Sequence, residues 1–334
     1  MNYIGIDFHK HFTHFAVLNQ SGEVLRRARI PSEKEALIEF IVNVGRPVKA
    51  AIEATRNWYW VFETIEPLVD DLKLAAPHKI RIIAESTVKT DKIDAKVIAD
   101  LLRTNFLPTC YVPPLEIRQK REILRHRAFL VRERTKVKNR IHGILDKEGI
   151  HHPFGDLFTQ SGIKFLQSLE LSWAYQTELD DYLEMLKYLS EKIKEQNRTI
   201  EVLCKESEAS SLLRTIPGIG FHNSLLITSE IGEIDRFATG TKYAGYCGLV
   251  PTVHISERTV RYGQMSHSGN RWLRWTYVES AHIARRQSLR FSKLYKRVFQ
   301  KKGIQVALGA VAREMAVVSY YILKYKKEFR DYKW

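Results

Sequence analysis

The chain has 334 residues, which is too long for one small hydrophobic core and predicts two or three domains. Hydrophobic residues make up 44% of it, so we expect a packed globular protein and exclude a disordered one. The net charge of +15 predicts a polyanionic partner, and we expect a nucleic acid rather than a membrane because no apolar run approaches the ~18 residues of a membrane span.

Residues 1–110 alternate the signals of strands and helices. Short apolar runs predict strands over Tyr3–Phe8, Phe12–Leu18, Val24–Ile30, Val48–Glu53 and Ile80–Ala84. Amphipathic spacing predicts helices over Ser32–Val44, Trp58–Leu68 and from Asp91 to about Arg103. Three meandering strands followed by alternating helices and strands predict an α/β domain of the ribonuclease H type, with its first and fourth strands side by side.

Four carboxylates are spaced along this domain. Asp7 and Glu53 close the first and fourth predicted strands, and Asp91 and Asp94 share one face of the third helix. Each alone fits a structural acid, since helices favour acids in the first turn and strands often end in one. Together they form an oxygen cage suited to Mg²⁺, with Mn²⁺ as a substitute, and two such ions clamp the attacking and leaving oxygens of a phosphodiester. We therefore predict a catalytic metal site.

A basic helical extension is predicted over residues 111–150. Between Arg118 and Arg140 there are ten Lys or Arg and two acids, and the resulting net charge of +8 repels itself unless it meets phosphate. A solvated helix face is the alternative interpretation. The predicted contacts to nucleic acid are Arg118, Lys120, Arg121, Arg125, Arg132, Lys136, Lys138 and Arg140.

A coiled-coil segment is predicted over residues 151–207. Its seam follows steps of three and four through Leu179, Tyr182, Leu186, Leu189, Ile193, Gln196, Ile200 and Leu203. Such a seam pairs either within the chain or between protomers. We favour self-association, because a single polar residue in a seam, here Gln196, fixes the register of the partners.

A mainly α C-terminal domain is predicted over residues 208–334. Near its start lies Ile216–Gly220, which resembles the turn of helix-hairpin-helix modules, where Gly218 and Gly220 would offer backbone N–H groups to a DNA phosphate. A plain turn between two helices is the alternative. From Arg258 onwards there are eighteen Lys or Arg and four acids, interleaved with aromatic residues that suit backbone clamping and base stacking.

The cysteines indicate a reducing environment. Cys110, Cys204 and Cys247 lie far apart and match no zinc or redox spacing, so we expect them to be buried and reduced in a cytoplasmic protein.

Several stretches of the sequence resemble one known family. The order Asp, Glu, Asp, Asp is similar to the site of RuvC-type Holliday-junction resolvases, and Gly5–Asp7, Glu53–Thr55 and Lys89–Ala95 are similar to the DEDD transposases of the IS110 insertion-sequence family. Two C-terminal stretches, Tyr243–Pro251 and Gly269–Arg274, resemble signatures of the same family. The resemblance spans nearly the full chain.

The resemblance implies a site-specific recombinase that moves its own element. It implies a composite site, in which the metal-binding carboxylates act with a C-terminal serine that maps onto Ser256 and forms a phosphoserine intermediate. Because Glu257 departs from the family's Ser-Gly, Ser266 and Ser268 are alternative nucleophiles. Further contacts to nucleic acid are expected at Arg258, Arg261, Arg271 and Arg274.

The resemblance also implies partners. They are the DNA of the element ends and target, a structured non-coding guide RNA, and further copies of the chain, as a dimer that becomes a tetramer in the synapse. The implied location is the bacterial or archaeal cytoplasm, in association with the nucleoid.

Two other functions stay open. The first is a metal-dependent junction nuclease of the RuvC type, in which water attacks and no covalent intermediate forms. The second is a non-catalytic nucleic-acid-binding protein whose carboxylates are structural. Replacement of Ser256 separates the recombinase from the nuclease, and replacement of Asp7 separates both enzymes from the binding protein.

Overall fold

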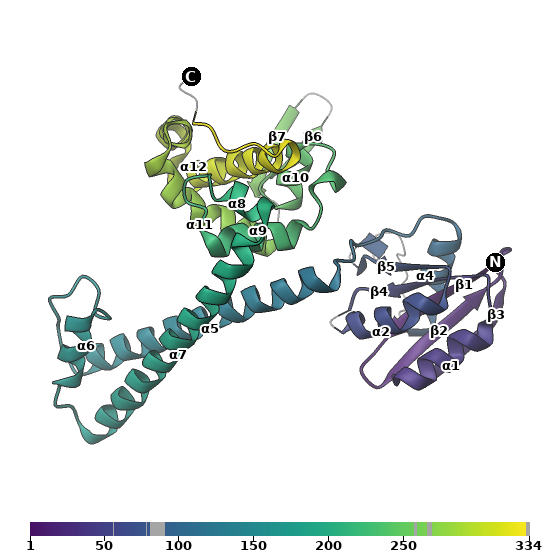
Figure 1. Cartoon of the computed structure of the whole chain (residues 1–334), viewed down its shortest axis with the longest axis horizontal. Coiled ribbons are helices and arrows are strands. Elements are labelled where there is room, and N and C mark those ends of the chain that lie inside the picture. The colour runs from purple at the N-terminus through teal and green to yellow at the C-terminus, as the bar shows by residue number, and fades with distance from the viewer. Residues whose placement is uncertain (56, 78, 81–90, 257–258, 266–268, 332–334) are drawn as a thin grey trace. The chain divides into compact units, whose positions relative to one another are not determined.

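The structure is a computed structural model of the chain. It describes residues 1–55, 57–77, 79–80, 91–256, 259–265 and 269–331, and within these it describes the backbone alone for 91–93, 253–256, 259–262 and 264. The chain folds into two compact units, Met1–Val112 and Pro113–Trp334 (Figure 1). The division into four parts stays a prediction.

A mixed five-stranded sheet forms the centre of the first unit. In sheet order its strands are β3 (Val24–Pro31), β2 (Phe12–Leu18), β1 (Asn2–Phe8), β4 (Val48–Glu53) and β5 (Asp71–Ala75). The strand β2 runs antiparallel to both β1 and β3, whereas β4 runs parallel to β1 and β5 runs parallel to β4. The predicted adjacency of the first and fourth strands is confirmed, and the fold is an α/β fold like that of ribonuclease H.

Helices cover both faces of this sheet. On one face, α1 (Lys34–Val44), α2 (Trp58–Ile65) and the short 3₁₀ helix Glu66–Leu68 enclose a core that includes Ile4, Ile6 and Ile52. On the other face lies α4 (Asp91–Arg103), whose Ala95 and Ala99 pack on Ala16 and Leu18. Because side chains alternate along a strand, Gly5 and Asp7 of β1 belong to the face of α4.

The prediction of a strand over Ile80–Ala84 is wrong at its first residue. Ile80 lies in a helical turn, where its amide donates to the carbonyl of Ala76, and residues 81–84 lie outside the described residues. The place beside β4 is taken by β5, because Leu72 and Leu74 pair with the strand there.

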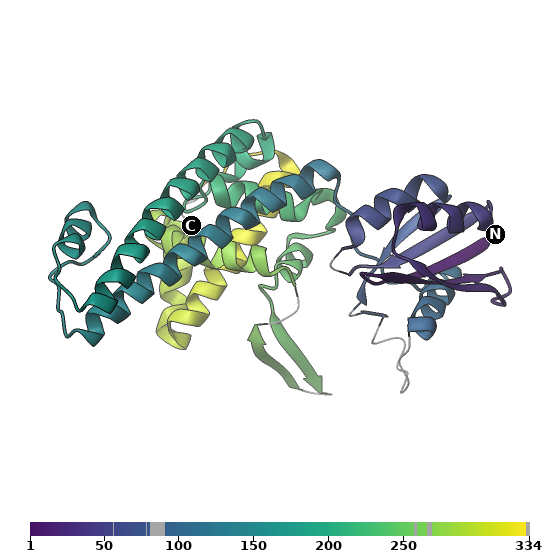
Figure 2. The same cartoon turned by 90° about the horizontal axis from the view of Figure 1, so that it is seen from below.

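The second unit is mainly helical. Its helices are α5 (Leu115–Lys147), α6 (Gln160–Gln167), α7 (Trp173–Lys205), α8 (Glu208–Leu213), α9 (Phe221–Ile231), the 3₁₀ helix Ile234–Arg236, α10 (Gly240–Tyr246), α11 (Arg271–Gln287) and α12 (Leu289–Tyr325). Between α10 and α11 the chain forms an antiparallel hairpin of β6 (Pro251–Ser256) and β7 (Thr259–Met265). Figure 2 shows this hairpin projecting from the helices of its own unit.

The predicted seam of α7 is used within the chain. Leu179, Leu186, Leu189 and Ile193 are buried in one cluster with Val137, Ile141, Ile144 and Leu145 of α5. The two helices lie side by side in Figures 1 and 2. The expectation that this seam serves self-association is therefore corrected: α5 of the same chain covers it. The predicted homo-oligomer itself stays a prediction.

The glycine turn between α8 and α9 packs tightly against α11. Gly218 has φ of +87°, and a Cβ at this position would lie 2.5 Å from the carbonyl oxygen of Ser280. Glycine is required here by backbone conformation and by this close approach. Two helices do flank the turn, as predicted, but the contact of Gly218 and Gly220 with phosphate stays a prediction.

The helix α12 is an exception to the expectation that no apolar stretch approaches the length of a membrane span. Among the described helices it alone is long and apolar enough to cross a membrane, with a window of mean hydropathy 1.5. Its apolar side chains Leu308, Val311 and Met315 are buried in the core of the second unit. It is a core helix.

The C-terminal segment holds the start of α12. The Asp331 carboxylate accepts hydrogen bonds from the amides of Leu289 (2.8 Å) and Arg290 (3.0 Å) and from the hydroxyl of Ser288 (3.0 Å). A carboxylate at a helix N-terminus satisfies unpaired N–H groups and interacts favourably with the helix dipole.

We expect Asp331→Ala to destabilise the second unit by about 1 kcal/mol, because the first turn of α12 loses this cap. The midpoint of its denaturant-induced unfolding should fall. Glu328→Ala, which changes an exposed acid in the same segment, is the matched control. An equal fall in both variants would contradict a capping role for Asp331.

Two of the three cysteines are buried, as expected. Cys204 and Cys247 are fully buried, whereas Cys110 is partly exposed, and all three are free thiols. Burial raises the pKa of the Cys247 thiol to about 12, so this side chain stays protonated and unreactive at neutral pH.

Candidate active site

Asp7 lies at the end of β1 and is 4% exposed. Its Oδ2 is 3.1 Å from Nε2 of His9, which donates a hydrogen bond when the ring is protonated at that nitrogen. His14, opposite Asp7 on β2, is buried as well. A buried carboxylate needs such polar partners, since burial disfavours its charge.

Glu53 ends the neighbouring parallel strand. The registered pairs of β1 and β4 run up to Ile6 opposite Ile52, which places Asp7 and Glu53 one step further at the same edge of the sheet. Ala51 packs on α4, so alternation assigns Glu53 to the face of α4 as well. Asp7 and Glu53 are therefore assigned to the same face of the sheet, at the C-terminal ends of two neighbouring strands.

The helix α4 brings the remaining two acids to this edge. A Cβ on Gly5 would lie 1.9 Å from the carbonyl oxygen of Ala95, so the helix backbone rests directly on β1. A Cβ on Gly22, in the hairpin beside the start of β1, would lie 3.0 Å from the side chain of Arg103 at the helix end. The helix therefore runs antiparallel to β1, and its N-terminal turn with Asp94 lies towards the Asp7 end.

Among the described side chains, Asp7, Glu53 and Asp94 share a region but do not form a closed metal site. The described side chains include no group of three or more His, Cys, Asp or Glu that could hold a metal ion. The side chain of Asp91 lies outside the described part. The donor set nonetheless fits a hard divalent cation, because it consists of carboxylate oxygens from two strand ends and one helix.

Ser256 is the last residue of β6, opposite Thr259 in the hairpin. Its backbone is described, its side chain is not. Of the other predicted residues here, Ser266, Ser268 and Arg258 lie outside the described residues, and only the backbone of Arg261 is described.

The two ends of this hairpin are tightly joined. A Cβ on Gly269 would lie 2.7 Å from Cα of Gly248, and the Asn270 amide donates to the carbonyl of Tyr246 at 2.8 Å. Nε of Arg274 donates to the carbonyl of Gly248 at 3.1 Å. The two stretches that resembled family signatures therefore meet in space and fix the root of the strand that carries Ser256.

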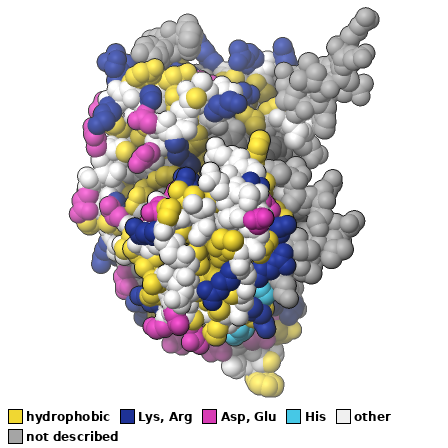
Figure 3. Space-filling model, turned by 90° about the vertical axis from the view of Figure 1, so that its right-hand side faces the viewer, with side chains coloured by type: hydrophobic (Ala, Val, Ile, Leu, Met, Phe, Trp, Pro, Cys, Tyr) yellow, Lys and Arg dark blue, Asp and Glu magenta, His cyan; other side chains and the backbone are white. Residues whose placement is uncertain are grey.

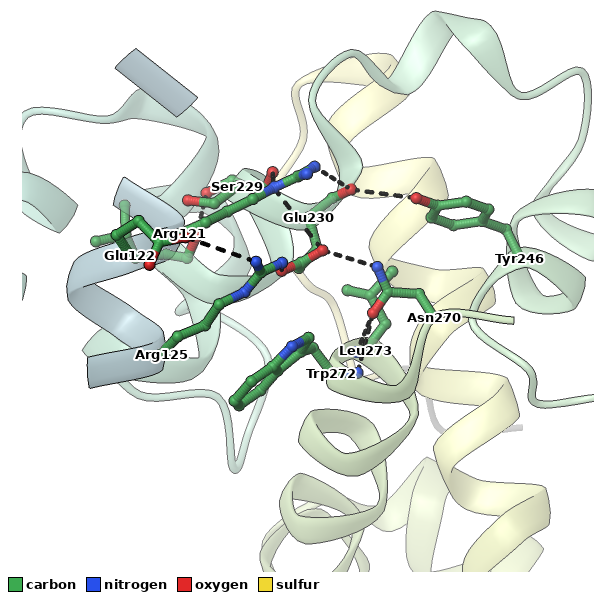
Figure 4. Close-up of polar contacts among 11 residues, drawn as sticks. Arg121, Glu122, Arg125, Ser229, Glu230, Tyr246, Asn270, Trp272 and Leu273 are labelled. Atoms are coloured by element: carbon green, nitrogen blue, oxygen red, sulfur yellow. Dashed lines mark hydrogen bonds and ion pairs between the residues drawn. The ribbon is translucent and has the colours of Figure 1, made fainter. Parts of the chain in front are cut away.

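A buried ion-pair network lies beside this root (Figure 4). Glu230 of α9 is 2% exposed. Its carboxylate accepts hydrogen bonds from Arg125 of α5 at 2.9 Å and from Asn270 at 2.8 Å, and Nε of Arg121 lies 3.8 Å away. Asn270 in turn caps α11, accepting from the amides of Trp272 and Leu273. The network therefore links α5, α9 and α11.

The network changes the role of two predicted contacts. Arg121 is only 11% exposed and also donates to the carbonyls of Ser229 and Glu230, so it acts inside the protein rather than on nucleic acid. Arg125 pairs with Glu230 inside the protein, but 31% of its side chain is exposed to solvent. The sequence analysis missed Glu230, although a single acid in the apolar stretch Leu225–Ile231 was a usable signal.

Other basic residues of α5 have partners on the same surface. Lys120 pairs with Glu116 and Lys136 pairs with Glu133, while Lys138 lies 4.4 Å from the ring of Phe158. Their contact with nucleic acid, together with that of Arg118, Arg132, Arg140 and Arg271, stays a prediction.

The fold and these carboxylates define a class of protein, the metal-dependent phosphoryl-transfer enzymes built on a ribonuclease H-like sheet. Comparison with protein families identifies one family within this class. Residues 4–149 match the DEDD transposases of IS110, and residues 210–296 match the transposases of the IS116/IS110/IS902 family. Together the matches cover well over half of the chain, and it belongs to this family: it is a DEDD transposase, an enzyme that cleaves and transfers DNA strands.

Individual relatives agree with this assignment. The chain is 26% identical to the transposase for insertion sequence element IS1328 of Yersinia enterocolitica, over 96% of both chains. It is 22% identical to the transposase for insertion sequence element IS1111A of Coxiella burnetii, over 98% of this chain and 91% of that one. It is also 28% identical to the pilin gene-inverting protein of Moraxella bovis, over 36% of this chain and 38% of that one.

Membership in the family has two consequences. A transposase binds DNA, so the polyanion indicated by the net charge includes DNA. A DEDD transposase requires a divalent metal ion, and the assignment of Asp7, Glu53, Asp91 and Asp94 as its ligands stays a prediction.

Proposed function

We propose that the chain is a site-specific DNA recombinase that is guided by a structured RNA and acts through a phosphoserine intermediate. Asp7, Glu53, Asp91 and Asp94 hold Mg²⁺, and Ser256 is the nucleophile. One observation carries the metal site: α4 rests on Gly5 and runs antiparallel to β1, which brings its acidic first turn towards the buried Asp7. In this proposal, DNA binding closes the carboxylates around the cation.

The carboxylates prepare the phosphate for attack. When bound, the cation neutralises charge on the scissile phosphate and on the leaving oxygen. Asp7 provides a fixed, buried ligand, because His9 holds its Oδ2. Glu53 and Asp94 complete the donor set from the neighbouring strand and helix.

Ser256 carries the covalent step. Its Oγ forms a bond to the scissile phosphorus, the bond from phosphorus to the leaving DNA oxygen breaks, and that oxygen takes up a proton. A DNA hydroxyl then attacks the phosphoserine and displaces Oγ, so strands are exchanged without an external energy source. The joined root of the hairpin, at Gly248 and Gly269, fixes where the strand that ends at Ser256 leaves the helices of the second unit.

The proposal includes partners and location. The guide RNA would supply target choice by base pairing, while the protein holds backbones. The recombinase would act as a dimer that becomes a tetramer in the synapse, within the cytoplasm and close to the nucleoid. The similarity to a pilin gene-inverting protein supports a site-specific rearrangement of DNA, as opposed to simple hydrolysis.

Ser256→Ala is expected to abolish the covalent protein–DNA adduct while DNA binding persists, because the variant removes only Oγ. The parent would be expressed with its flanking non-coding DNA, supplied with Mg²⁺ and its element end, and analysed on a denaturing gel. Ser266→Ala and Ser268→Ala are controls of the same chemistry and should keep the adduct.

Three results would count against this assignment. An adduct that survives in Ser256→Ala but is lost in one of the controls would move the nucleophile to that serine. Cleaved DNA without an adduct in the parent would favour the nuclease that uses water. An unchanged activity without the flanking non-coding DNA would contradict guidance by RNA.

A further inference from the structure

The corner between α11 and the first half of α12 carries an uninterrupted run of positive charge. From Ser280 to Arg313 the sequence contains nine Lys or Arg and no Asp or Glu. Seven of these cations are exposed: Arg286, Lys293, Lys296, Arg297, Lys301, Lys302 and Arg313. Such a run repels itself unless it meets a polyanion. In the space-filling view of Figure 3, Lys and Arg side chains are seen among acidic and hydrophobic ones.

Two aromatic rings are stacked within this charged run. Tyr295 and Phe299, one helical turn apart, have ring centroids 5.5 Å apart and planes inclined by 14°. The guanidinium of Arg285, at the end of α11, lies 4.7 Å from the centre of the Tyr295 ring. Arg285 and Phe299 therefore both pack on Tyr295, which holds the group in one orientation.

The ring of Phe299 is open to solvent. This side chain is 47% exposed, and Ile304 and Val306, just past the break in the helix at Gly303, are exposed as well. By helical spacing Lys296 and Lys302 lie three residues before and after Phe299, on the same side. A stacked aromatic ring with cations on either side matches the way proteins bind single strands, by base stacking and backbone neutralisation.

We propose that this surface, defined by Tyr295, Lys296, Phe299 and Lys302, binds an unpaired DNA strand. A base stacks on Phe299, and the two lysines contact the adjoining phosphates. The strand must be unpaired, because in a duplex both faces of a base are covered by its neighbours. A transposase cleaves and transfers DNA strands, and that activity exposes unpaired DNA. The proposal is independent of the nucleophile and of RNA guidance.

The test is a binding titration of the full chain, followed by fluorescence anisotropy, with one sequence as single-stranded DNA, duplex DNA and single-stranded RNA. Phe299→Ala should weaken binding of the single-stranded DNA about tenfold, as expected for loss of one stacked base, and should leave duplex affinity unchanged. Phe299→Trp should retain affinity. Lys296→Gln with Lys302→Gln should reduce the salt dependence by about 1.4 in slope for single-stranded DNA.

Tyr188→Ala is the matched control, since this exposed aromatic residue lies on α7 among charges of both signs. It should bind like the parent. Equal losses for single-stranded and duplex DNA in Phe299→Ala would overturn the stacking proposal, as would unchanged binding. A loss confined to RNA would assign the surface to RNA, and a change of oligomeric state alone, measured by light scattering, would assign it to a second copy of the chain.

Discussion

Asp7→Asn is expected to lower DNA strand cleavage by roughly 10³-fold or more while DNA affinity is kept or rises slightly. The amide has nearly the shape of the carboxylate and still bonds to His9, so the sheet should stay intact. In the proposed site, the substitution removes an anionic ligand of the divalent ion, whose stabilisation of the charge that develops in the reaction is worth several kcal/mol. Binding should improve if it changes, because one negative charge near the phosphate is removed.

Asp100→Asn is the matched control for this variant. Asp100 lies on the same helix as Asp94 but in its later half, where it pairs with Arg103 at 3.2 Å and both side chains are partly exposed. Loss of such a partly exposed pair costs about 1 kcal/mol, and cleavage should stay within a few-fold of the parent. If Asp7→Asn cleaved DNA as well as Asp100→Asn, the acids of the sheet would be structural.

Glu230→Ala is expected to destabilise the second unit by about 3 kcal/mol. The substitution leaves Arg121 and Arg125 without their buried counter-charge and Asn270 without an acceptor. Breaking a buried ion pair from one side costs about 3–5 kcal/mol, and the partial exposure of Arg125 favours the lower end of that range. Denaturant-induced unfolding of the full chain would measure the loss.

The comparison for this variant is Glu195→Ala, which removes an exposed acid that pairs with Lys192 on α7. It should cost less than about 1 kcal/mol. Glu230→Gln should fall between the two, because the amide keeps an oxygen for one donor but loses the charge. Similar stabilities of Glu230→Ala and Glu195→Ala would show that the network contributes little.

Local patterns predicted most of the first unit. The apolar runs at β1, β2 and β4 and the acidic start of α4 are visible in a few neighbouring residues, and their positions were predicted to within about one residue. The strand β5 was missed because only Leu74 and Ala75 of its five residues are buried, so it has little apolar signal of its own. Its place is fixed by pairing with β4.

Non-local pairing explains the remaining differences. The repeat of α7 indicated that a partner exists, but nothing in a periodicity identifies that partner, which is α5. Similarly, Arg121 and Arg125 look like surface cations in their own helix, and their acid, Glu230, lies more than a hundred residues away. The four carboxylates could be selected from the sequence as candidate metal ligands because each lies near a recognisable element end, and their role stays a prediction.

The most direct test of the carboxylate site is a titration of the full chain with Mn²⁺, in which free ion is measured by electron paramagnetic resonance. We expect binding by the parent and by Asp100→Asn, and at least about tenfold weaker binding by Asp7→Asn and Glu53→Gln, which each remove one proposed anionic ligand. Equal binding by all four proteins would contradict the proposed site, because the ion would then be held elsewhere.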